Sequence, residues 1–289
     1  MNALPADLPS PLPADLGQQV ARALGEDVAG GDVTANLVPA RQRVRGRIIT
    51  REPMILCGMA WVEETFRQLD PTISLAWTIA EGARAEAGAT LLNIEGPARP
   101  ILTGERTALN FLQLLSATAT EARRYVDAVA GTSCTILDTR KTIPGLRTAQ
   151  KYAVRCGGAR NHRLGLYDMV LIKENHIAAA GSLTQAIGTA RRAAPRLQVE
   201  TEVESLAQLE EALVAHPDIV MLDNFTLQDL RAAVSRNRQL GAPVRLEASG
   251  GASLETVRAI AATGVDFISV GAITKHVHAI DLSMRLEFA

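Results

Sequence analysis

The chain has 289 residues, of which 47% are hydrophobic and 21% charged, a composition typical of globular proteins and too apolar for a disordered one. Its 30 basic and 31 acidic residues almost cancel, so no overall charge attracts nucleic acid or a membrane surface. Only 3% of the residues are aromatic, which is few for a protein that stacks single-stranded nucleic acid, and we expect neither a nucleic-acid nor a membrane partner.

The amino-terminal segment is rich in proline and repeats the sequence Pro-Ala-Asp-Leu at 5–8 and 13–16. We expect residues 1–16 to form a flexible arm.

No basic residue precedes Arg22, and no apolar run approaches the length of about 18 residues that a membrane span needs. The three cysteines are widely spaced, as in proteins of a reducing compartment. The sequence thus predicts a cytoplasmic protein.

The segment from 44 to 102 combines strand-like and helical patterns. Apolar runs predict strands at 44–51, 73–79 and 90–94. The spacing over 59–69 predicts a helix, and together these elements indicate a small α+β domain. The next run, to Val129, is helical with Thr103 as its expected N-cap, and we expect this helix to join two domains.

From residue 135 on, short apolar runs alternate with amphipathic helical patterns. The predicted strands are 135–139, 169–173, 199–203, 219–223, 244–249 and 267–271. The predicted helices are 182–194, 205–215, 226–239 and 253–263, each beginning at a Ser or Thr that can cap it. Strands linked through helices in this way pair in parallel, in either an open doubly wound sheet or a closed barrel.

A strongly basic stretch runs from Thr139 to Lys173. Its 35 residues contain one acid, Asp168, and eight basic residues: Arg140, Lys141, Arg147, Lys151, Arg155, Arg160, Arg163 and Lys173. Arg140, Lys141 and Lys173 stand at predicted strand ends, the edge where parallel α/β folds build their sites, so we expect them to bind a small polyanion. The set Arg147, Lys151 and Arg155, spaced four apart, also fits a solvated helix face.

Two carboxylates, Glu202 and Asp223, end neighbouring predicted strands. They can hold Mg²⁺ with its waters, bond sugar hydroxyls or stabilise a developing positive charge, and a structural ion pair is the alternative. Glycines follow the last two strands, within 249–251 and 270–272. Backbone N–H groups beside glycine can approach a phosphate closely, although glycine can also serve turn geometry alone.

Seven segments of the chain resemble one known family. They read ED at 26–27, GDVT at 31–34, GERTALN at 104–110, DTRKTIPG at 138–145, GARNHR at 158–163, LIKENH at 171–176 and ETE at 200–202. These motifs are similar to those of the quinolinate phosphoribosyltransferases, also called carboxylating nicotinate-nucleotide pyrophosphorylases. The resemblance extends from about residue 25 to residue 273.

The resemblance implies an α/β fold with an N-terminal α/β sandwich and an incomplete, seven-stranded β/α barrel. The implied ranges are 17–114 for the sandwich, joined by the tail 275–289, and 115–274 for the barrel, so one strand would be missing from the six predicted. The implied reaction joins quinolinate and phosphoribosyl pyrophosphate, with Mg²⁺, to give nicotinate mononucleotide, pyrophosphate and CO₂, a step of de novo NAD biosynthesis.

The resemblance also implies roles for individual residues. The quinolinate pocket would comprise Thr139, Arg140, His162, Arg163 and Lys173, with Arg106 from the neighbouring subunit of a homodimer. Lys141, Glu202 and Asp223 would be catalytic, and the two carboxylates would hold Mg²⁺ through water. Phosphoribosyl pyrophosphate would contact Lys141, Ser249, Gly250, Gly251, Val270, Gly271 and Ala272.

Two alternatives to this function stay open. One is a related phosphoribosyltransferase of the same fold acting on another heterocycle, but a substrate with one carboxylate would not need Arg140, Arg163 and Lys173 together. The other is a non-catalytic sensor of phosphate ligands, which the presence of Glu202 and Asp223 disfavours.

Overall fold

The computed structural model describes residues 11–288, so residues 1–10 of the predicted arm lie outside the described part. The chain forms two compact units. The first contains the chain up to Arg123, the segment Thr142–Gly158 and the tail from His276, and the second contains Arg124–Lys141 and Ala159–Lys275. A helix that the sequence did not predict, α1 (Leu16–Val28), begins where the predicted arm ends.

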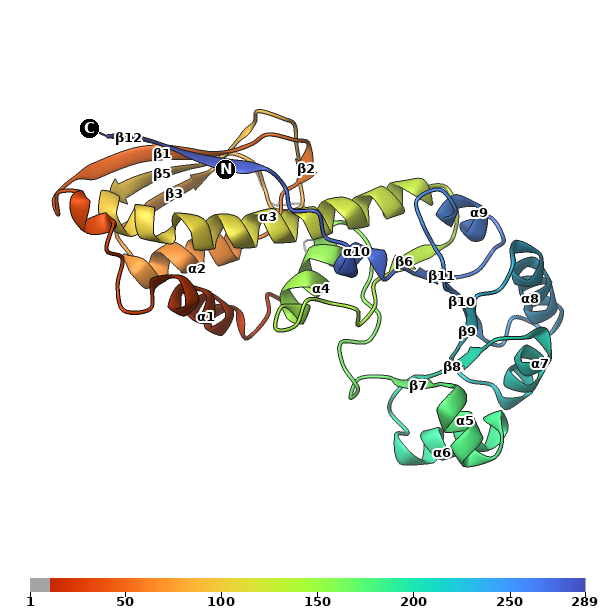
Figure 1. The fold of residues 1–289 in the computed structure, drawn as a ribbon. Coiled ribbons are helices and arrows are strands. Elements are labelled where there is room, and N and C mark those ends of the chain that lie inside the picture. Colours follow the sequence, from red (N-terminus) through yellow and green to blue (C-terminus); the bar gives the residue numbers. More distant parts are fainter. Residues whose placement is uncertain (1–10, 289) are drawn as a thin grey trace. The chain divides into compact units, whose positions relative to one another are not determined.

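A four-stranded antiparallel sheet forms the centre of the first unit (Figure 1). In the order β12-β1-β5-β3, its strands are β1 (Arg43–Thr50), β3 (Ser74–Trp77), β5 (Thr90–Pro97) and β12 (Leu282–Phe288). Two short strands, β2 (Met54–Ile55) and β4 (Arg84–Ala85), pair with each other. Because β12 pairs with β1 along its whole length, the carboxyl-terminal tail completes the amino-terminal sheet.

Helices cover one face of this sheet (Figure 1). Helices α2 (Met59–Leu69) and α3 (Ala98–Ala128) pack on the sheet. Helices α1 and α4 (Arg147–Cys156) pack against α2 and α3, and a 3-10 turn lies at Ala35–Leu37. The sheet shares a hydrophobic core with α2 and α3 that includes Ile48, Phe66 and Leu109. A second core around Val20 and Trp61 joins α1, α2, α3 and α4. This unit is the α/β sandwich that the sequence predicts.

The long helix α3 begins at Ala98, so the prediction of Thr103 as its N-cap is wrong. The Thr103 hydroxyl lies inside the helix, 3.0 Å from the Arg99 carbonyl oxygen and 2.9 Å from an Asp32 carboxylate oxygen. Gly104 follows it, and a Cβ there would stand 2.6 Å from Leu69 Cδ1. The absence of a side chain at Gly104 therefore allows α3 to lie close against α2.

Helix α4 belongs to the first unit, although the implied ranges place it within the barrel at 115–274. The reason is its packing, because Tyr152 and Cys156 lie in the same hydrophobic core as Val20 and Trp61. Lys151 is also 1% exposed, so a solvated helix face is wrong for this residue.

The second unit contains a sheet of six parallel strands with helices along its outer side (Figure 1). Its strands are β6 (Thr135–Leu137), β7 (Val170–Ile172), β8 (Val199–Val203), β9 (Ile219–Asp223), β10 (Arg245–Ser249) and β11 (Phe267–Ser269). Its helices are α5 (Glu174–Ala180), α6 (Leu183–Ala193), α7 (Leu206–Ala215), α8 (Leu227–Gln239), α9 (Val257–Ala261) and α10 (Ala272–Lys275). All six predicted strands are present.

The strand order, β6-β11-β10-β9-β8-β7, makes this sheet an incomplete barrel. The first strand of the unit, β6, pairs with the last, β11, as a closing barrel requires. Leu137, the last residue of β6, also forms a single parallel bridge with Arg160. Among residues 11–288 the implied seventh strand is therefore reduced to this bridge, and no ladder joins it to β7.

Three of the four predicted helix caps are confirmed. The side-chain oxygens of Ser182, Ser205 and Thr226 each accept a backbone N–H from the residue three positions later. The fourth is wrong, because α9 begins only at Val257 and Ser253 instead donates its backbone N–H to the Thr256 hydroxyl at 2.9 Å. Before this turn, Gly250 and Gly251 adopt φ angles of +93° and +63° in the loop that follows β10.

Candidate active site

A cavity of about 380 Å³ lies at the carboxyl ends of the parallel strands in the second unit. Its lining residues are Thr139, Arg140, Lys141, His162, Arg163, Leu171, Lys173, Glu202, Met221, Asp223, Glu247, Ser249 and Ser269. Nine of them are site residues that the sequence analysis singles out. The cavity is where parallel α/β folds bind ligands, because loops and helix N-termini converge at that edge.

The lining falls into two layers, because side chains two residues apart on a strand share a face. Lys173, Glu202, Asp223 and Ser249 lie at or just beyond the ends of successive strands. Two residues earlier on three of these strands stand Leu171, Met221 and Glu247. The floor of the cavity therefore combines two apolar side chains with a buried acid, beneath a charged rim.

Lys141 is placed by its backbone rather than by its side chain. Its N–H donates to the Thr139 hydroxyl at 3.1 Å, and its carbonyl accepts the Thr274 hydroxyl at 2.9 Å. A Cβ on Gly271 would stand 3.1 Å from Lys141 Cδ, so glycine leaves room for the lysine stem. The ammonium is exposed at the cavity, where it can meet an anionic ligand.

Asp138 holds the segment that carries His162 and Arg163 against β6. Its buried carboxylate accepts the side-chain amide of Asn161 at 2.6 Å and the backbone N–H of His162 at 2.9 Å. The backbone of Arg160 pairs with Ile136 and Asp138 on the same strand. The two basic residues are therefore fixed to the barrel even though no full strand carries them.

The hydrogen bonds of His162 define its tautomer. Nδ1 accepts the backbone N–H of Arg163 at 2.8 Å, so the ring proton is on Nε2, which lies 2.8 Å from Glu200 Oε2. Arg163 stands near a second guanidinium, and burial together with Arg140 lowers its pKa. Two cations held this close favour a ligand with more than one negative charge.

Lys173 and Glu202 form an ion pair across the mouth of the cavity. Asp223 lies on the next strand and accepts the side-chain amide of Asn224 at 2.8 Å. A Cβ on Gly250 would stand 2.1 Å from Asn224 Oδ1, so this position requires glycine. Gly250 thereby allows Asn224 to orient the Asp223 carboxylate.

Three carboxylates at this rim are suited to a hard cation. Oxygens of Glu202, Glu204 and Asp223 all lie within 4.8 Å of one another. All three side chains are at least partly exposed, so a bound Mg²⁺ could keep most of its waters. Glu204 was missed in the sequence, where it lies beyond the predicted strand 199–203.

The glycine-containing loops contribute less than the sequence suggests. Of the predicted phosphate-binding residues other than Lys141, only Ser249 lines the cavity. The backbone N–H of Val270 already donates to Leu137 at 2.8 Å, so it is not free for a phosphate. Gly271 and Ala272 stand at the start of α10, whose first N–H groups point out of the helix.

Two buried acids below the rim were not predicted. Glu200 and Glu247 are both 0% exposed. Burial raises the pKa of Glu200 to about 7, and burial together with the Glu200 charge raises the pKa of Glu247 to about 8. The available signal was an acid inside a predicted strand, Glu200 within 199–203 and Glu247 within 244–249.

Arg106 lies on α3 in the first unit, where it is exposed. It lines a separate hollow of about 270 Å³ with residues that include Asp27 and Asp32. Its predicted role therefore depends on a partner subunit.

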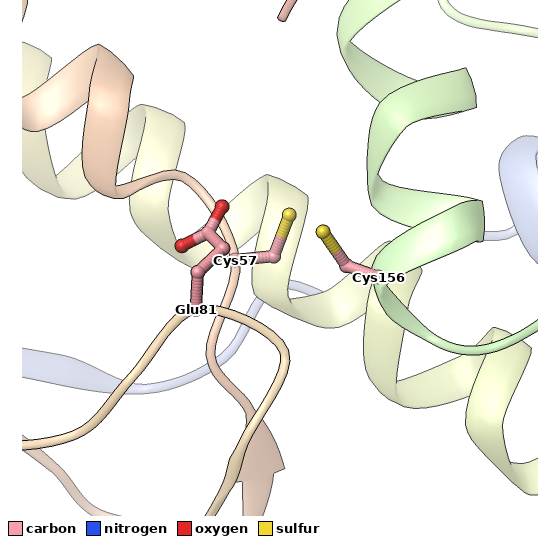
Figure 2. Close-up of side chains that lie close together, drawn as sticks. All are labelled: Cys57, Glu81 and Cys156. Atoms are coloured by element: carbon pink, nitrogen blue, oxygen red, sulfur yellow. The ribbon is translucent and has the colours of Figure 1, made fainter. Parts of the chain in front are cut away.

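A second cluster of metal-ligand types lies in the first unit, where Cys57, Glu81 and Cys156 face one another (Figure 2). The Glu81 carboxylate accepts the backbone N–H groups of Gly58 at 2.9 Å and Met59 at 3.2 Å, and burial raises its pKa. Burial also raises the pKa of the Cys57 thiol well above its usual range. A buried thiol with a raised pKa, beside a carboxylate that already accepts two backbone N–H groups, is typical of a packed core network rather than a metal centre.

Comparison with known proteins decides the family. The model of the quinolinate phosphoribosyl transferase N-terminal domain matches residues 32–116, and that of the C-terminal domain matches residues 118–285. The chain belongs to the quinolinate phosphoribosyltransferase family. It is therefore an enzyme that transfers a phosphoribosyl group to quinolinate with loss of CO₂, and the alternative functions gain no support.

Similar proteins cover nearly the whole chain. A carboxylating nicotinate-nucleotide pyrophosphorylase of Mycobacterium leprae is 45% identical over 275 residues, which are 92% of this chain and 95% of that protein. A probable one of Bacillus subtilis is 40% identical and covers 91% of each. The nicotinate-nucleotide pyrophosphorylase structure from Francisella tularensis is 47% identical, with a TM-score of 0.93 over 98% of this chain and 100% of that one. Within residues 11–288 no helix is long and apolar enough to span a membrane.

Proposed function

We propose that the cavity of the second unit is the active site and that its basic wall binds the two carboxylates of quinolinate. The wall comprises Arg140, His162, Arg163 and Lys173, with the Thr139 hydroxyl beside them. The observation that carries this assignment is that Arg140 and Arg163 line the same cavity, where burial and, secondly, the charge of Arg140 lower the pKa of Arg163. Such mutual repulsion costs stability unless a polyanionic ligand offsets it.

Phosphoribosyl pyrophosphate takes the opposite side of the cavity in this proposal. Lys141 meets its phosphate groups, and the loop at Ser249 with Gly250 and Gly251, together with Gly271 and Ala272, receives a phosphate through backbone N–H groups. Glu202 and Asp223 bond the ribose hydroxyls and face the anomeric carbon. Mg²⁺ bound through water to these carboxylates would neutralise the pyrophosphate and make it a better leaving group.

The reaction then needs positioning and charge stabilisation rather than a protein nucleophile. The pyridine nitrogen attacks the anomeric carbon, the bond to pyrophosphate breaks, and pyrophosphate leaves with the electron pair. Glu202 and Asp223 stabilise the positive charge that develops on the ribose ring. The carboxylate next to the nitrogen leaves as CO₂, and its electron pair stays on the ring beside N⁺ until a proton replaces it.

A homodimer with shared sites completes the proposal, with Arg106 entering the neighbouring subunit's cavity. Its support is that Arg106 is exposed on α3 and has no assigned role in its own unit. We also propose a cytoplasmic location, which suits three cysteines that are all free and buried.

The test is product analysis with purified protein and quinolinate labelled with ¹⁴C in the carboxylate next to nitrogen. With phosphoribosyl pyrophosphate and Mg²⁺ we expect one ¹⁴CO₂ per pyrophosphate, and loss of both products when a chelator removes Mg²⁺. Lys141→Ala serves as the matched inactive protein. Nucleotide formation from nicotinate without CO₂ release would contradict the proposal.

A further inference from the structure

Two fully buried carboxylates lie below the imidazole of His162. Glu200 Oε2 is 2.8 Å from His162 Nε2, and Glu247 Oε2 is 3.6 Å from the same nitrogen. Both acids are 0% exposed, and the imidazole is 7% exposed. In the proposed reaction the rim carboxylates of Glu202 and Asp223 contact the ribose and Mg²⁺. Glu200 and Glu247 have no role in it.

The sheet register explains how the two acids meet. Glu200 on β8 pairs with Ile219, and Glu247 on β10 pairs with Met221, so β9 runs between them. Both side chains point into the barrel, because each stands two residues before a rim residue of its own strand. They form the layer beneath the proposed substrate pocket.

The chemistry of this pair requires a proton. Glu200 Oε1 and both carboxylate oxygens of Glu247 are buried, and among the described residues none of them has a hydrogen-bond partner within 3.5 Å. Burial raises the pKa of Glu247, and the nearby Ser269 hydroxyl opposes that rise only in part. Ligand oxygens of the two acids lie within 4.8 Å of each other, and two ionised carboxylates at that distance away from water repel strongly. A proton on Glu247 turns this repulsion into an O–H···O hydrogen bond to Glu200.

We propose that Glu247 is a positioning residue for quinolinate binding. As a protonated acid it donates a hydrogen bond to the Glu200 carboxylate. This bond holds Glu200 where it accepts the Nε2–H of His162. With Nε2 protonated, Nδ1 accepts the Arg163 N–H and fixes the backbone of that residue. The inference rests on the proposed assignment of His162 and Arg163 to the quinolinate pocket. The proposed contacts of phosphoribosyl pyrophosphate are with rim residues that include Glu202 and Ser249, which take no part in the hydrogen bonds of this chain.

The test compares Glu247→Leu, which removes the donor, with Glu247→Gln, whose amide can still donate to Glu200. Thr201→Val is the matched control, because Thr201 is buried on the same strand as Glu200 and points to the other face of the sheet. We expect Glu247→Leu to raise the KM for quinolinate about tenfold, the effect of one lost hydrogen bond. The KM for phosphoribosyl pyrophosphate should change less than about twofold, and Glu247→Gln should restore most of the quinolinate affinity.

A spectroscopic readout separates positioning from packing. In protein labelled with ¹⁵N-histidine, His162 is assigned with the His162→Gln variant and should show a protonated Nε2 and an unprotonated Nδ1. Glu247→Leu should shift the ring toward a mixture of tautomers, whereas Glu247→Gln and Thr201→Val should leave it unchanged. If Glu247→Leu does not fold, Glu247→Gln decides, since a changed tautomer or a tenfold higher quinolinate KM in that variant overturns the proposal.

The outcomes distinguish this inference from the proposed function. An unchanged quinolinate KM in His162→Gln would remove His162 from the pocket, and the assignment of the site would be wrong. A raised KM in His162→Gln with normal KM and normal tautomer in Glu247→Leu would overturn the role of Glu247 alone.

Discussion

The buried carboxylate of Asp138 accepts the backbone N–H of His162 at 2.9 Å, next to the single bridge that stands in place of a seventh strand. This contact connects the end of β6 to the segment that carries His162 and Arg163. We expect Asp138→Ala to lower the free energy of unfolding by about 1–3 kcal/mol, because it leaves buried donors unpaired. Urea unfolding measures the loss, and the quinolinate KM should rise with it. Normal stability and KM would show that the segment is held by other contacts.

Lys141→Ala and Glu202→Ala should each lower kcat by about 10² to 10³, the effect of removing one group that stabilises the transition state. Neither side chain supports a hydrophobic core, so the melting temperature should stay within a few degrees of that of the wild type. Arg196→Ala, an exposed basic residue of the same unit, is the control and should keep full activity. Near-normal turnover in either variant would remove that residue from the mechanism.

Arg163→Lys keeps the positive charge but loses the planar pair of donors that matches a carboxylate. The KM for quinolinate should rise by at least about tenfold, with the KM for phosphoribosyl pyrophosphate nearly unchanged. Steady-state kinetics with each substrate varied in turn gives both values. An equal rise in the two constants would show that Arg163 does not act on quinolinate selectively.

The shared-site dimer predicts complementation between two inactive proteins. Arg106→Ala and Lys141→Ala homodimers should each be nearly inactive, but random exchange makes about half of all dimers mixed. Each mixed dimer then has one site with both mutations and one with neither, so activity should return to about a quarter of the wild-type value. Native mass spectrometry confirms the exchange, and exchange without recovery would place Arg106 outside the neighbour's site.

Glu247 predicts a pH dependence of stability. Burial and the Glu200 charge raise its pKa to about 8 in the folded protein, from 4.5. Between these values the folded state binds a proton that the unfolded chain releases, so this contribution to the free energy of unfolding is lost as pH rises through about 8. Urea titrations between about pH 5 and pH 9 should show a steeper decline for the wild type than for Glu247→Gln. Parallel curves would contradict the raised pKa.

The regular elements could be predicted because their signals are local. The cap hydroxyls at Ser182, Ser205 and Thr226 each precede an amphipathic run, and helix α2 occupies the predicted range Met59–Leu69. The start of α3 could not, because Ala98 carries no cap signal and Thr103 does. Helix α1 was hidden by the prolines before it, since a loose arm and the first turn of a helix share that composition.

The site shows the same division between local and long-range information. The rim residues could be predicted because a polar residue follows each predicted strand, and parallel strands bring all these positions to one edge of the sheet. The layer beneath depends on register between strands far apart in sequence, which aligns Glu247 of β10 with Met221 of β9. A buried acid in an apolar strand indicates an unusual environment, but only the folded barrel shows that its partners are Glu200 and His162.

A crystal structure of the protein with quinolinate bound tests the assignment of the active site most directly. We expect the ligand in the cavity of the second unit, with its carboxylates on Arg140, Arg163 and Lys173 and with Nδ1 of His162 still accepting the Arg163 N–H. Density for Arg106 of the partner subunit should reach the same ligand. Quinolinate bound elsewhere on the chain, or in this cavity without a carboxylate on Arg140 or Arg163, would contradict the assignment of the site.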